Sequence, residues 1–365
     1  MAPNLAVSSG EVLLTWLEPV KSAAGKAHRL RFSRLAGDRW SPPVTIASGP
    51  DFFANWADFP AVIAAPDGSL VAHWLEKAGP GAYAYGIKLA RSTDRGATWS
   101  PSGSLHPEDA ASEYGFVSWL PEGKAVRAVW LDGREMKGMS ENESAMTLRT
   151  AALRGGKVEG DVRIDERVCS CCQTDAALTD IGPVIAYRDR SEGEVRDISV
   201  IRRTAGGWSR PVRVHADNWM IPGCPVNGPA IAASGRRVAV AWFTAAPPNP
   251  RVQVAFSADG GTTFGPAVLV DGDKPFGRVD LALDANGDAL VSWLAAGGKG
   301  AELRLRRITA KGKLGKLLTL ATTSAARSSG FPRLVRTGDR LLLAWVDDGD
   351  PSKVRAGVVG ISALR

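Results

Sequence analysis

Short apolar runs that end in an aromatic residue recur along the whole chain. The seven runs are VLLTW at Trp16, LVAHW at Trp74, VRAVW at Trp130, PVIAY at Tyr187, VAVAW at Trp242, ALVSW at Trp293 and LLLAW at Trp345. Successive aromatic residues are separated by 51 to 58 residues. A period of this length is typical of repeat architectures, in which each repeat is one small unit of secondary structure.

Each repeat shows the same order of segments. A first segment such as FPAVIA at 59–64 precedes a turn such as Asp67-Gly68, which leads into the aromatic run. A third segment such as IKLARS at 87–92 and a fourth such as PVTIAS at 43–48 complete the repeat. Alternation with period two predicts strands, and no window of comparable length has helical periodicity.

The repeats therefore predict an all-β fold. Seven units of four strands indicate a seven-bladed β-propeller of four-stranded antiparallel blades, in a single domain over residues 1–365. A six-bladed ring with an added sheet is the alternative. The last repeat supplies only three strands before Arg365.

Composition is that of a soluble globular protein, with 44% hydrophobic and 23% charged residues. The net charge of +7 arises from basic residues interspersed with carboxylates, which argues against a nucleic-acid-binding surface. The absence of an 18-residue apolar run argues against a membrane span. Met1-Ala2-Pro3 leads directly into strand-like sequence. We therefore expect a monomeric periplasmic or secreted protein whose leader is absent from this chain.

The sulfur-containing residues gather in one third of the chain. The segment Cys169-Ser170-Cys171-Cys172 holds three of the four cysteines, and Cys224 follows in the next repeat. Apart from Met1, the methionines are Met136, Met139, Met146 and Met220. In a propeller, the segments leading into first strands share a face with the loops between second and third strands. These sulfurs are therefore expected to converge on one face.

Thiolate and thioether ligands together favour copper(I). We predict a metal site formed by Cys169, Cys171, Cys172, Cys224, Met136, Met139 and Met220, with His215 as a further candidate ligand. A disulfide from Cys224 to Cys171 or Cys172 is one alternative. Zinc bound by four cysteines is another, although Cys-x-Cys-Cys is not a usual zinc spacing.

Two turns carry a family pattern. Residues 92–99 read Ser-Thr-Asp-Arg-Gly-Ala-Thr-Trp, and residues 257–264 read Ser-Ala-Asp-Gly-Gly-Thr-Thr-Phe. A degenerate copy includes Ser33, Gly37 and Trp40. The chain thus resembles the Asp-box, or BNR-repeat, sialidase-like propellers over all of its repeats. The box joins the third and fourth strands, where its polar side chains bond to the turn backbone.

The resemblance also implies a chemistry. Sialidases of this family use three arginines on the substrate carboxylate, a tyrosine nucleophile polarised by a glutamate, and an aspartate as acid and base. The Arg-Ile-Pro signature is absent, and Phe331-Pro332-Arg333 is its nearest counterpart. Sialidases are also six-bladed. If the chain is a glycosidase, the candidate residues are Asp58, Glu113, Tyr114, Arg134, Arg278 and Arg333.

Three functional hypotheses follow. The first is an exported binding protein that holds copper(I), or otherwise a small anionic ligand, on its upper face. The second is a glycoside hydrolase of the exo-sialidase type that acts on an anionic sugar. The third is a disulfide-stapled adhesion or scaffold propeller.

Overall fold

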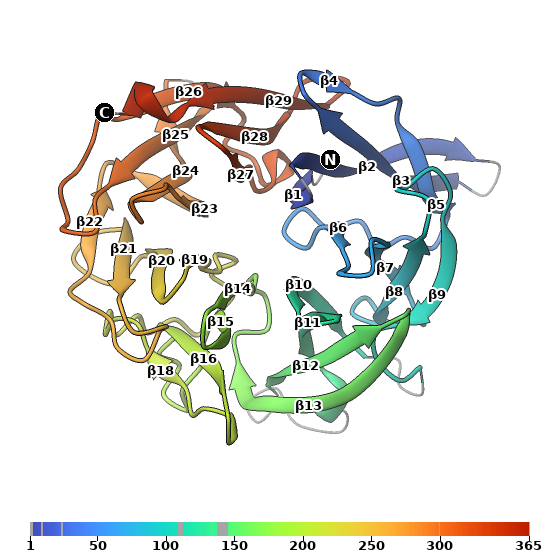
Figure 1. Cartoon of the computed structure of the whole chain (residues 1–365), viewed down its shortest axis with the longest axis horizontal. Coiled ribbons are helices and arrows are strands. Elements are labelled where there is room, and N and C mark those ends of the chain that lie inside the picture. Colours follow the sequence, from blue (N-terminus) through green and yellow to red (C-terminus); the bar gives the residue numbers. More distant parts are fainter. Residues whose placement is uncertain are drawn as a thin grey trace. The chain divides into compact units, whose positions relative to one another are not determined.

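The computed structural model describes residues 3–8, 10–22, 25–108, 112–136, 145–298 and 300–364. They form seven antiparallel sheets in chain order (Figure 1). The fold is the predicted seven-bladed β-propeller, and each sheet is one blade. The chain divides into two compact units, Met1–Glu166 and Arg167–Arg365. Its organisation as a single domain stays a prediction.

The first unit contains three blades. The first blade consists of β1 (Asn4–Ser8), β2 (Glu11–Ser22), β3 (Gly25–Ala36), β4 (Arg39–Trp40) and β5 (Val44–Gly49). The second consists of β6 (Ala61–Ala64), β7 (Leu70–Lys77), β8 (Tyr85–Ser92) and β9 (Ser100–Ser104). The third consists of β10 (Tyr114–Glu122), β11 (Ala125–Asp132), β12 (Met146–Arg154) and β13 (Lys157–Val168), which crosses the unit boundary.

The second unit contains the remaining four blades. The fourth consists of β14 (Asp175–Thr179), β15 (Gly182–Arg188), β16 (Ile198–Thr204), β17 (Gly207–Trp208) and β18 (Val212–Arg213). The fifth consists of β19 (Ala230–Ser234), β20 (Arg237–Thr244), β21 (Arg251–Ser257) and β22 (Val268–Asp271). The sixth consists of β23 (Pro275–Leu283), β24 (Ala289–Gly297), β25 (Gly300–Ile308) and β26 (Leu318–Thr323). The seventh has three strands, β27 (Arg333–Thr337), β28 (Arg340–Asp347) and β29 (Lys353–Gly360).

Two blades have an outer strand in two pieces. In the first blade β4 and β5 both pair with β3, and in the fourth β17 and β18 both pair with β16. The helices among the described residues are the short 3-10 turns η1 (Arg134–Met136), η2 (Arg327–Ser329) and η3 (Ile361–Leu364). None of these has the length or the apolar character of a membrane-spanning helix.

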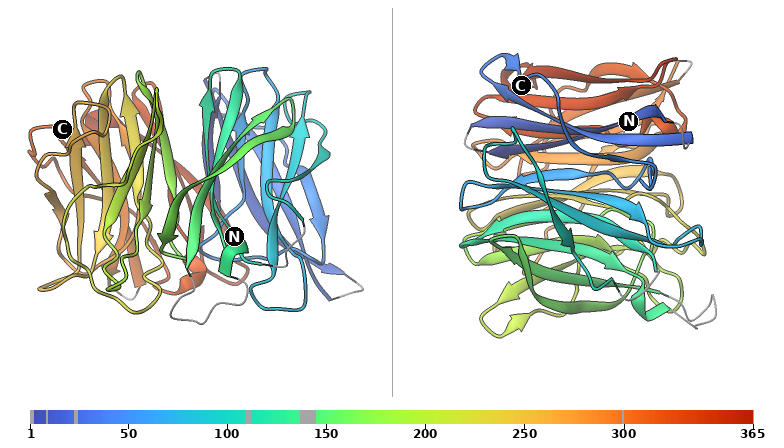
Figure 2. Two further views of the ribbon diagram at one scale, coloured as in Figure 1. Left: turned by 90° about the horizontal axis from the view of Figure 1, so that it is seen from below. Right: turned by 90° about the vertical axis from the view of Figure 1, so that its right-hand side faces the viewer.

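First strands of successive blades contact each other within each unit. In the first unit β6 contacts β1 and β10, and in the second unit β14, β19, β23 and β27 make contacts in that order. Turns between first and second strands, and between third and fourth strands, lie at one end of each sheet, which we call the turn end (Figure 2). The chain passes between blades at the other end, which we call the crossover end.

The seven aromatic residues occupy equivalent second-strand positions, as the repeat predicted. Each is paired with a third-strand residue: Trp16 with Arg31, Trp74 with Lys88, Trp130 with Arg149, Tyr187 with Ser199, Trp242 with Gln253, Trp293 with Arg304 and Trp345 with Arg355. The five middle members are buried, whereas Trp16 and Trp345 are half-buried. This equivalence confirms the repeat boundaries.

Carboxylates complete the aromatic layer in four blades. The indole N–H groups donate at 2.6–2.8 Å, from Trp74 to Glu76, Trp130 to Asp132, Trp242 to Asp217 and Trp293 to Asp271. A bond of this kind satisfies a buried donor and fixes the ring. In the sixth blade Arg304 also binds Asp271, at 3.0 Å. Arg304 is thus a basic residue whose charge is paired inside a blade and not at the surface.

Three aspartates near the start of a first strand join that blade to the next, and we call them the clasp aspartates. A carboxylate oxygen accepts a backbone N–H from the following blade in each case: Asp58 from Phe116 (2.8 Å), Asp175 from Ile231 (2.8 Å) and Asp280 from Leu334 (2.7 Å). The sequence separations are 58, 56 and 54 residues, or one repeat.

The two turns with the Asp-box pattern have matching hydrogen bonds. Between β8 and β9, Ser92 Oγ accepts the Gly96 N–H at 2.8 Å and Asp94 accepts the Thr98 hydroxyl at 2.6 Å. Between β21 and β22, Ser257 accepts from Gly261 at 2.9 Å and Asp259 accepts from Thr263 at 2.7 Å. The bonds from Thr98 hold the pKa of Asp94 at about 2. These groups organise the turns.

Candidate metal centre

Three cysteines lie in the crossover segment between β13 and β14. At the start of the segment, the Cys169 N–H donates to the Arg188 carbonyl at 3.0 Å. The segment ends at Gln173 and Asp175, which hold the next blade. Gln173 Oε1 accepts the Gly228 N–H at 2.9 Å. Two residues further along the chain, the clasp Asp175 accepts the Ile231 N–H. The cysteines therefore occupy a short bulge between two fixed points.

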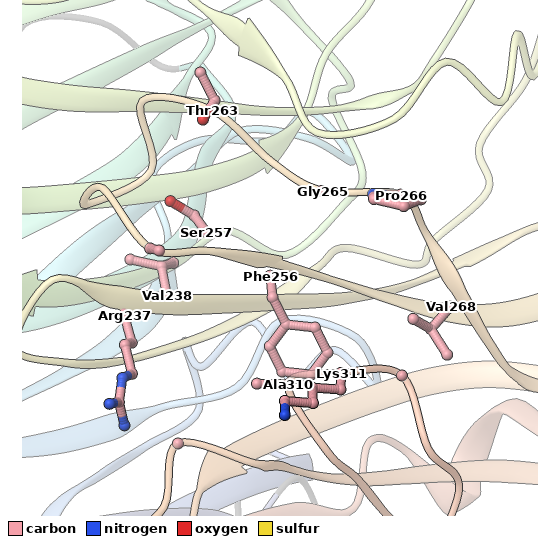
Figure 3. A pocket seen from close by; sticks show the side chains of 13 residues that line it. Arg237, Val238, Phe256, Ser257, Thr263, Gly265, Pro266, Val268, Ala310 and Lys311 are labelled. Carbon is pink, nitrogen blue, oxygen red and sulfur yellow. The ribbon is translucent and has the colours of Figure 1, made fainter.

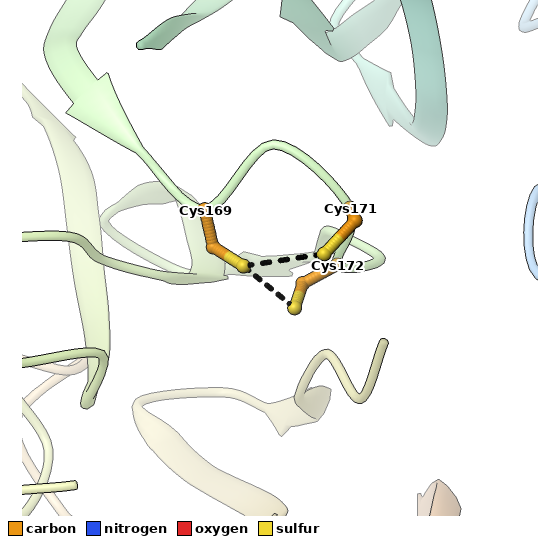
Figure 4. Close-up of side chains that lie close together, drawn as sticks. All are labelled: Cys169, Cys171 and Cys172. Carbon is orange, nitrogen blue, oxygen red and sulfur yellow. Dashed lines mark hydrogen bonds between the residues drawn. The ribbon is translucent and has the colours of Figure 1, made fainter. Parts of the chain in front are cut away.

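The three thiols converge (Figure 4). Cys169 Sγ lies 2.9 Å from Cys172 Sγ and 3.8 Å from Cys171 Sγ. All three sulfur atoms lie within 4.8 Å of one another. Cys169 and Cys172 are each 1% exposed, whereas Cys171 is half-buried.

Cys224 supplies the fourth sulfur from the next crossover segment. Its side chain hydrogen-bonds with the Cys171 thiol, although Cys224 itself is exposed. The four cysteines are thiols and form no disulfide in this structure. All four cysteines of the chain thus belong to one group, which we call the cysteine cluster.

Guanidinium groups surround the buried side of the cysteine cluster. Arg196 Nη1 lies 3.5 Å from Cys169 Sγ, and its Nη2 donates to Glu194 at 2.6 Å. Arg188 is 2% exposed and lies over the Trp219 ring, 4.9 Å from its centroid. It donates to the backbone carbonyls of Asn227, Arg196 and Phe243 at 2.6–2.8 Å. Carbonyl oxygens carry no full charge, so the positive charge of Arg188 is available to stabilise an anion nearby.

These surroundings favour one thiolate. Burial by itself raises the pKa of Cys169, but hydrogen bonds from Cys171 and Cys172, together with the charge of Arg188, bring that pKa well below the ordinary range. Donation to the neighbouring thiols raises the pKa of Cys171, and burial raises the pKa of Cys172. Two thiol donors and an arginine charge therefore favour the thiolate form of Cys169 over that of its two neighbours.

Cys169, Cys171 and Cys172 of the cysteine cluster could hold a metal ion. Metal–sulfur bonds of about 2.3 Å place the sulfur ligands of a tetrahedral ion about 3.8 Å apart. The separation of 3.8 Å between Cys169 and Cys171 matches this spacing, whereas Cys169 and Cys172 would have to open from 2.9 Å.

The other predicted ligands occupy different settings. Met220 is 69% exposed and its backbone bridges to Val195. The His215 ring lies 6.1 Å from the Trp242 ring, and its Nε2 lies 3.9 Å from Asp217. Met136 in η1 and the fully buried Met146 in β12 belong to the first unit. Met139 lies outside the described residues.

Two predicted glycosidase residues of the first unit, Asp58 and Glu113, belong to a polar group that also contains Tyr85. Asp58 is the clasp to Phe116, and burial raises its pKa to about 7, with the Phe116 N–H opposing and Glu113 adding to the effect. Burial also raises the pKa of Glu113, which accepts the Tyr85 hydroxyl at 2.8 Å. Sequence reasoning paired Glu113 with Tyr114 and missed Tyr85. The sequence feature that could have identified Tyr85 is its position at the start of a buried third strand.

Tyr114 and Arg134 have other partners. The Tyr114 ring stacks on His106 at 3.6 Å between centroids, and the Arg134 guanidinium lies 5.9 Å from the Tyr114 ring. Arg134 also binds Asp132 at 2.6 Å and Asp161 at 2.9 Å. Two carboxylates of the chain thus already occupy this guanidinium.

The two candidate arginines of the second unit are also engaged. Arg278 is 7% exposed and donates to Ser329 Oγ at 2.7 Å and to the Gly330 carbonyl at 3.0 Å. Burial, with the charge of Arg327 second, lowers its pKa to about 10. Arg333 Nε lies 3.3 Å from the clasp Asp280.

A groove of about 540 Å³ lies at the turn end of the fifth and sixth blades (Figure 3). Phe256 and Val268 line it together with the exposed Arg237 and Lys311. Within the described part of the chain, neither cation is in an ion pair. The groove is at the opposite end of the sheets from the cysteine cluster and is a separate surface.

Comparisons with known proteins show the fold. No protein-family model matches the chain, and no curated protein sequence matches it. Among solved structures, the polysaccharide lyase Uly1 is 10% identical with a TM-score of 0.57, covering 98% of this chain and 89% of the lyase. An α-L-arabinanase of Penicillium chrysogenum is 13% identical with a TM-score of 0.54, covering 84% and 94%. The intramolecular trans-sialidase of Ruminococcus gnavus is 11% identical with a TM-score of 0.50, covering 100% and 95%. The chain thus has a sialidase-like β-propeller fold.

Proposed function

We propose that this protein is an exported Asp-box propeller that binds a soft metal ion, copper(I), through the cysteine cluster. The observation that carries the proposal is the convergence of three sulfur atoms within 4.8 Å, with Cys224 in contact with Cys171. Met136, Met139, Met220 and His215 are proposed as additional ligands.

Charge supports a monovalent ion in a sulfur site. One copper(I) bound by two or three thiolates carries a net negative charge, which is costly to bury without a nearby cation. Arg196 lies 3.5 Å from Cys169, and the charge of Arg188 acts on the same sulfur. These arginines would stabilise the anionic metal complex.

The fold itself does not require the sulfurs. Gln173 and Asp175 already join the fourth blade to the fifth through the backbone N–H groups of Gly228 and Ile231. The Cys171–Cys224 hydrogen bond links the same two segments that Gln173 and Asp175 already join. This division of roles favours a ligand-binding role over a purely structural one.

The test is copper binding by anaerobically reduced protein. We expect retention of close to one equivalent of copper(I) against a competing chelator such as bicinchoninate. Cys171→Ser and Cys224→Ser should each weaken binding at least tenfold, because thiolates are the strongest ligands present. Ser170→Ala in the same segment and Met146→Leu in β12 are matched controls that should bind as the parent does.

Failure to retain copper(I) in the reduced parent protein would overturn this proposal. Retention of zinc in its place would correct the identity of the metal and keep the site. Export is tested independently, by fractionating cells that express the native gene product.

A glycoside hydrolase of the exo-sialidase type is the second candidate. The raised pKa of Asp58, about 7, and the Tyr85–Glu113 hydrogen bond are the observations that favour it. A carboxyl group that is half protonated near neutral pH can serve as a general acid. The lyase, arabinanase and trans-sialidase neighbours suggest a carbohydrate as substrate.

Hydrolysis of a fluorogenic sialoside tests this alternative. If the protein is a sialidase, Arg333→Lys should abolish turnover and leave the thermal unfolding midpoint close to that of the parent. The reason is that lysine cannot replace a bidentate guanidinium–carboxylate contact. Absence of turnover by the parent protein would eliminate sialidase activity.

A further inference from the structure

The four sulfurs of the cysteine cluster divide into two pairs with different access to solvent. Cys169 and Cys172 are 2.9 Å apart and both are 1% exposed. Cys171 is half-buried, hydrogen-bonds with Cys224, and Cys224 is exposed. One pair lies inside the protein, and the other lies at its surface.

The two thiols of each pair are close to each other: Cys169 Sγ lies 2.9 Å from Cys172 Sγ, and the Cys171 and Cys224 side chains are hydrogen-bonded. A disulfide bond is about 2.05 Å long, so each pair would have to move closer to form one. Cys169 and Cys172 have Cys-x-x-Cys spacing within one segment, whereas Cys171 and Cys224 come from segments that lead into different blades. Cys171 is selected as the partner of Cys224 because its thiol, which also contacts Cys169, hydrogen-bonds with the Cys224 side chain.

We propose that Cys171 and Cys224 form a thiol–disulfide exchange site for low-molecular-weight disulfides, and that their oxidation releases the metal of the cysteine cluster. The release step rests on the proposed function. The exchange step stands on the arrangement of the thiols alone.

The chemistry proceeds in two displacements. The exposed Cys224 thiolate attacks one sulfur of an incoming disulfide RSSR, which forms a mixed disulfide and releases RS⁻. The Cys171 thiolate then attacks Cys224 Sγ, which forms the Cys171–Cys224 bond and releases the second RS⁻. Two protein thiols are oxidised by two electrons, one disulfide is reduced, and the two thiol protons leave with the products.

Burial sets the order of oxidation. A disulfide reagent in solution reaches Cys224 directly, whereas Cys169 and Cys172 are closed to it while the protein is folded. After the first two-electron oxidation, the thiols of Cys169 and Cys172 therefore remain reduced. This oxidation also removes Cys171 and Cys224 from the ligand set, since a disulfide sulfur is a far weaker ligand than a thiolate.

The experiment treats metal-free, reduced, full-length protein with oxidised glutathione, blocks the remaining thiols, and analyses tryptic peptides without reduction. We expect the thiol count to fall from four to two. Peptide 168–188 should become joined to peptide 214–236, and fragmentation should place the link at Cys171. Cys224→Ser should abolish the joined peptide. Ser170→Ala should behave as the parent does.

Two results would overturn the exchange site: four thiols persisting under conditions that oxidise a model dithiol, or a link from Cys224 to Cys169 or Cys172. Copper-loaded protein gives the second measurement. Loss of at least half of its copper when the Cys171–Cys224 link forms supports release, whereas full retention contradicts it. Because exchange is measured without metal, failure of copper binding and failure of this inference are separate results.

Discussion

The segments that lead into β6 and β14 occupy equivalent places in their blades and use different chemistry. Before β6 the notable group is Asp58, whose buried carboxylate accepts the Phe116 N–H. Before β14 the same role falls to Asp175, and three cysteines precede it. The aspartates are thus part of the repeat, and the cysteines are an addition to one copy of it. Groups shared by several blades serve the fold, and groups present in one blade indicate a function.

The largest expected effect concerns the charge on Asp58. Burial raises its pKa from 3.8 to about 7. Its stabilising contribution is therefore complete below about pH 4 and is lost as pH rises through 7, because ionisation is harder in the folded state. Asp58→Asn keeps an acceptor for Phe116 and should raise the free energy of unfolding at pH 8 by up to about 4 kcal/mol. At pH 4 it should change little.

Urea unfolding between pH 4 and pH 8 measures this difference. The exposed Asp51→Asn in the same segment is the control. Equal pH profiles for Asp58→Asn and the parent would show that Asp58 is ionised at no cost, and the clasp would then be an ordinary charged hydrogen bond.

Removing the buried clasp Asp280 is expected to have an intermediate effect on the free energy of unfolding. Asp280→Ala leaves the buried N–H of Leu334 without its acceptor and removes one ion-pair partner of Arg333. An unsatisfied buried donor costs about 1–3 kcal/mol. The denaturation midpoint should fall accordingly, while copper binding is retained. Asp339 is an exposed aspartate of the next blade, and Asp339→Ala should leave stability unchanged. If Asp339→Ala lowered the midpoint as much as Asp280→Ala does, the clasp aspartates would have no special role in stability.

The smallest stability effect is expected in the cysteine cluster. In metal-free reduced protein, Cys171→Ser should change the free energy of unfolding by no more than about 0.5 kcal/mol, because the side chain is half-buried and Gln173 and Asp175 hold the blades together. The same variant should lose copper affinity. A stability loss as large as that of Asp280→Ala would assign the cysteines to the fold.

Much of the fold was predictable because blades repeat. The spacing of Trp16, Trp130 and Trp293 alone places second strands, and strand alternation then fixes which side chains are buried. The clasps could have been found in the same way, since Asp58, Asp175 and Asp280 bind backbone groups one repeat further along the chain.

The sites were less predictable, because they depend on contacts outside the repeat. Tyr85 meets Glu113 through an isolated bridge between neighbouring blades, and no local pattern shows that bridge. Met146 was grouped with the ligand-like sulfurs by its position in the chain, yet it is a fully buried residue of β12. The hydrogen bond between Cys171 and Cys224 joins adjacent crossover segments, but the sequence alone did not distinguish Cys171 from Cys172 as the partner of Cys224.

Gly228 limits how such a protein can diverge. A Cβ at this position would lie 2.0 Å from the carbonyl oxygen of Gln173, so any other residue would push apart the two crossover segments that carry Cys171 and Cys224. A lineage that keeps all four cysteines but replaces this glycine would hold its ligands out of reach of one another. The signature of such a propeller therefore has two parts, a Cys-x-Cys-Cys-Gln segment and a glycine four residues after the fourth cysteine. Genome searches could use it to find other propellers with the same arrangement of cysteines.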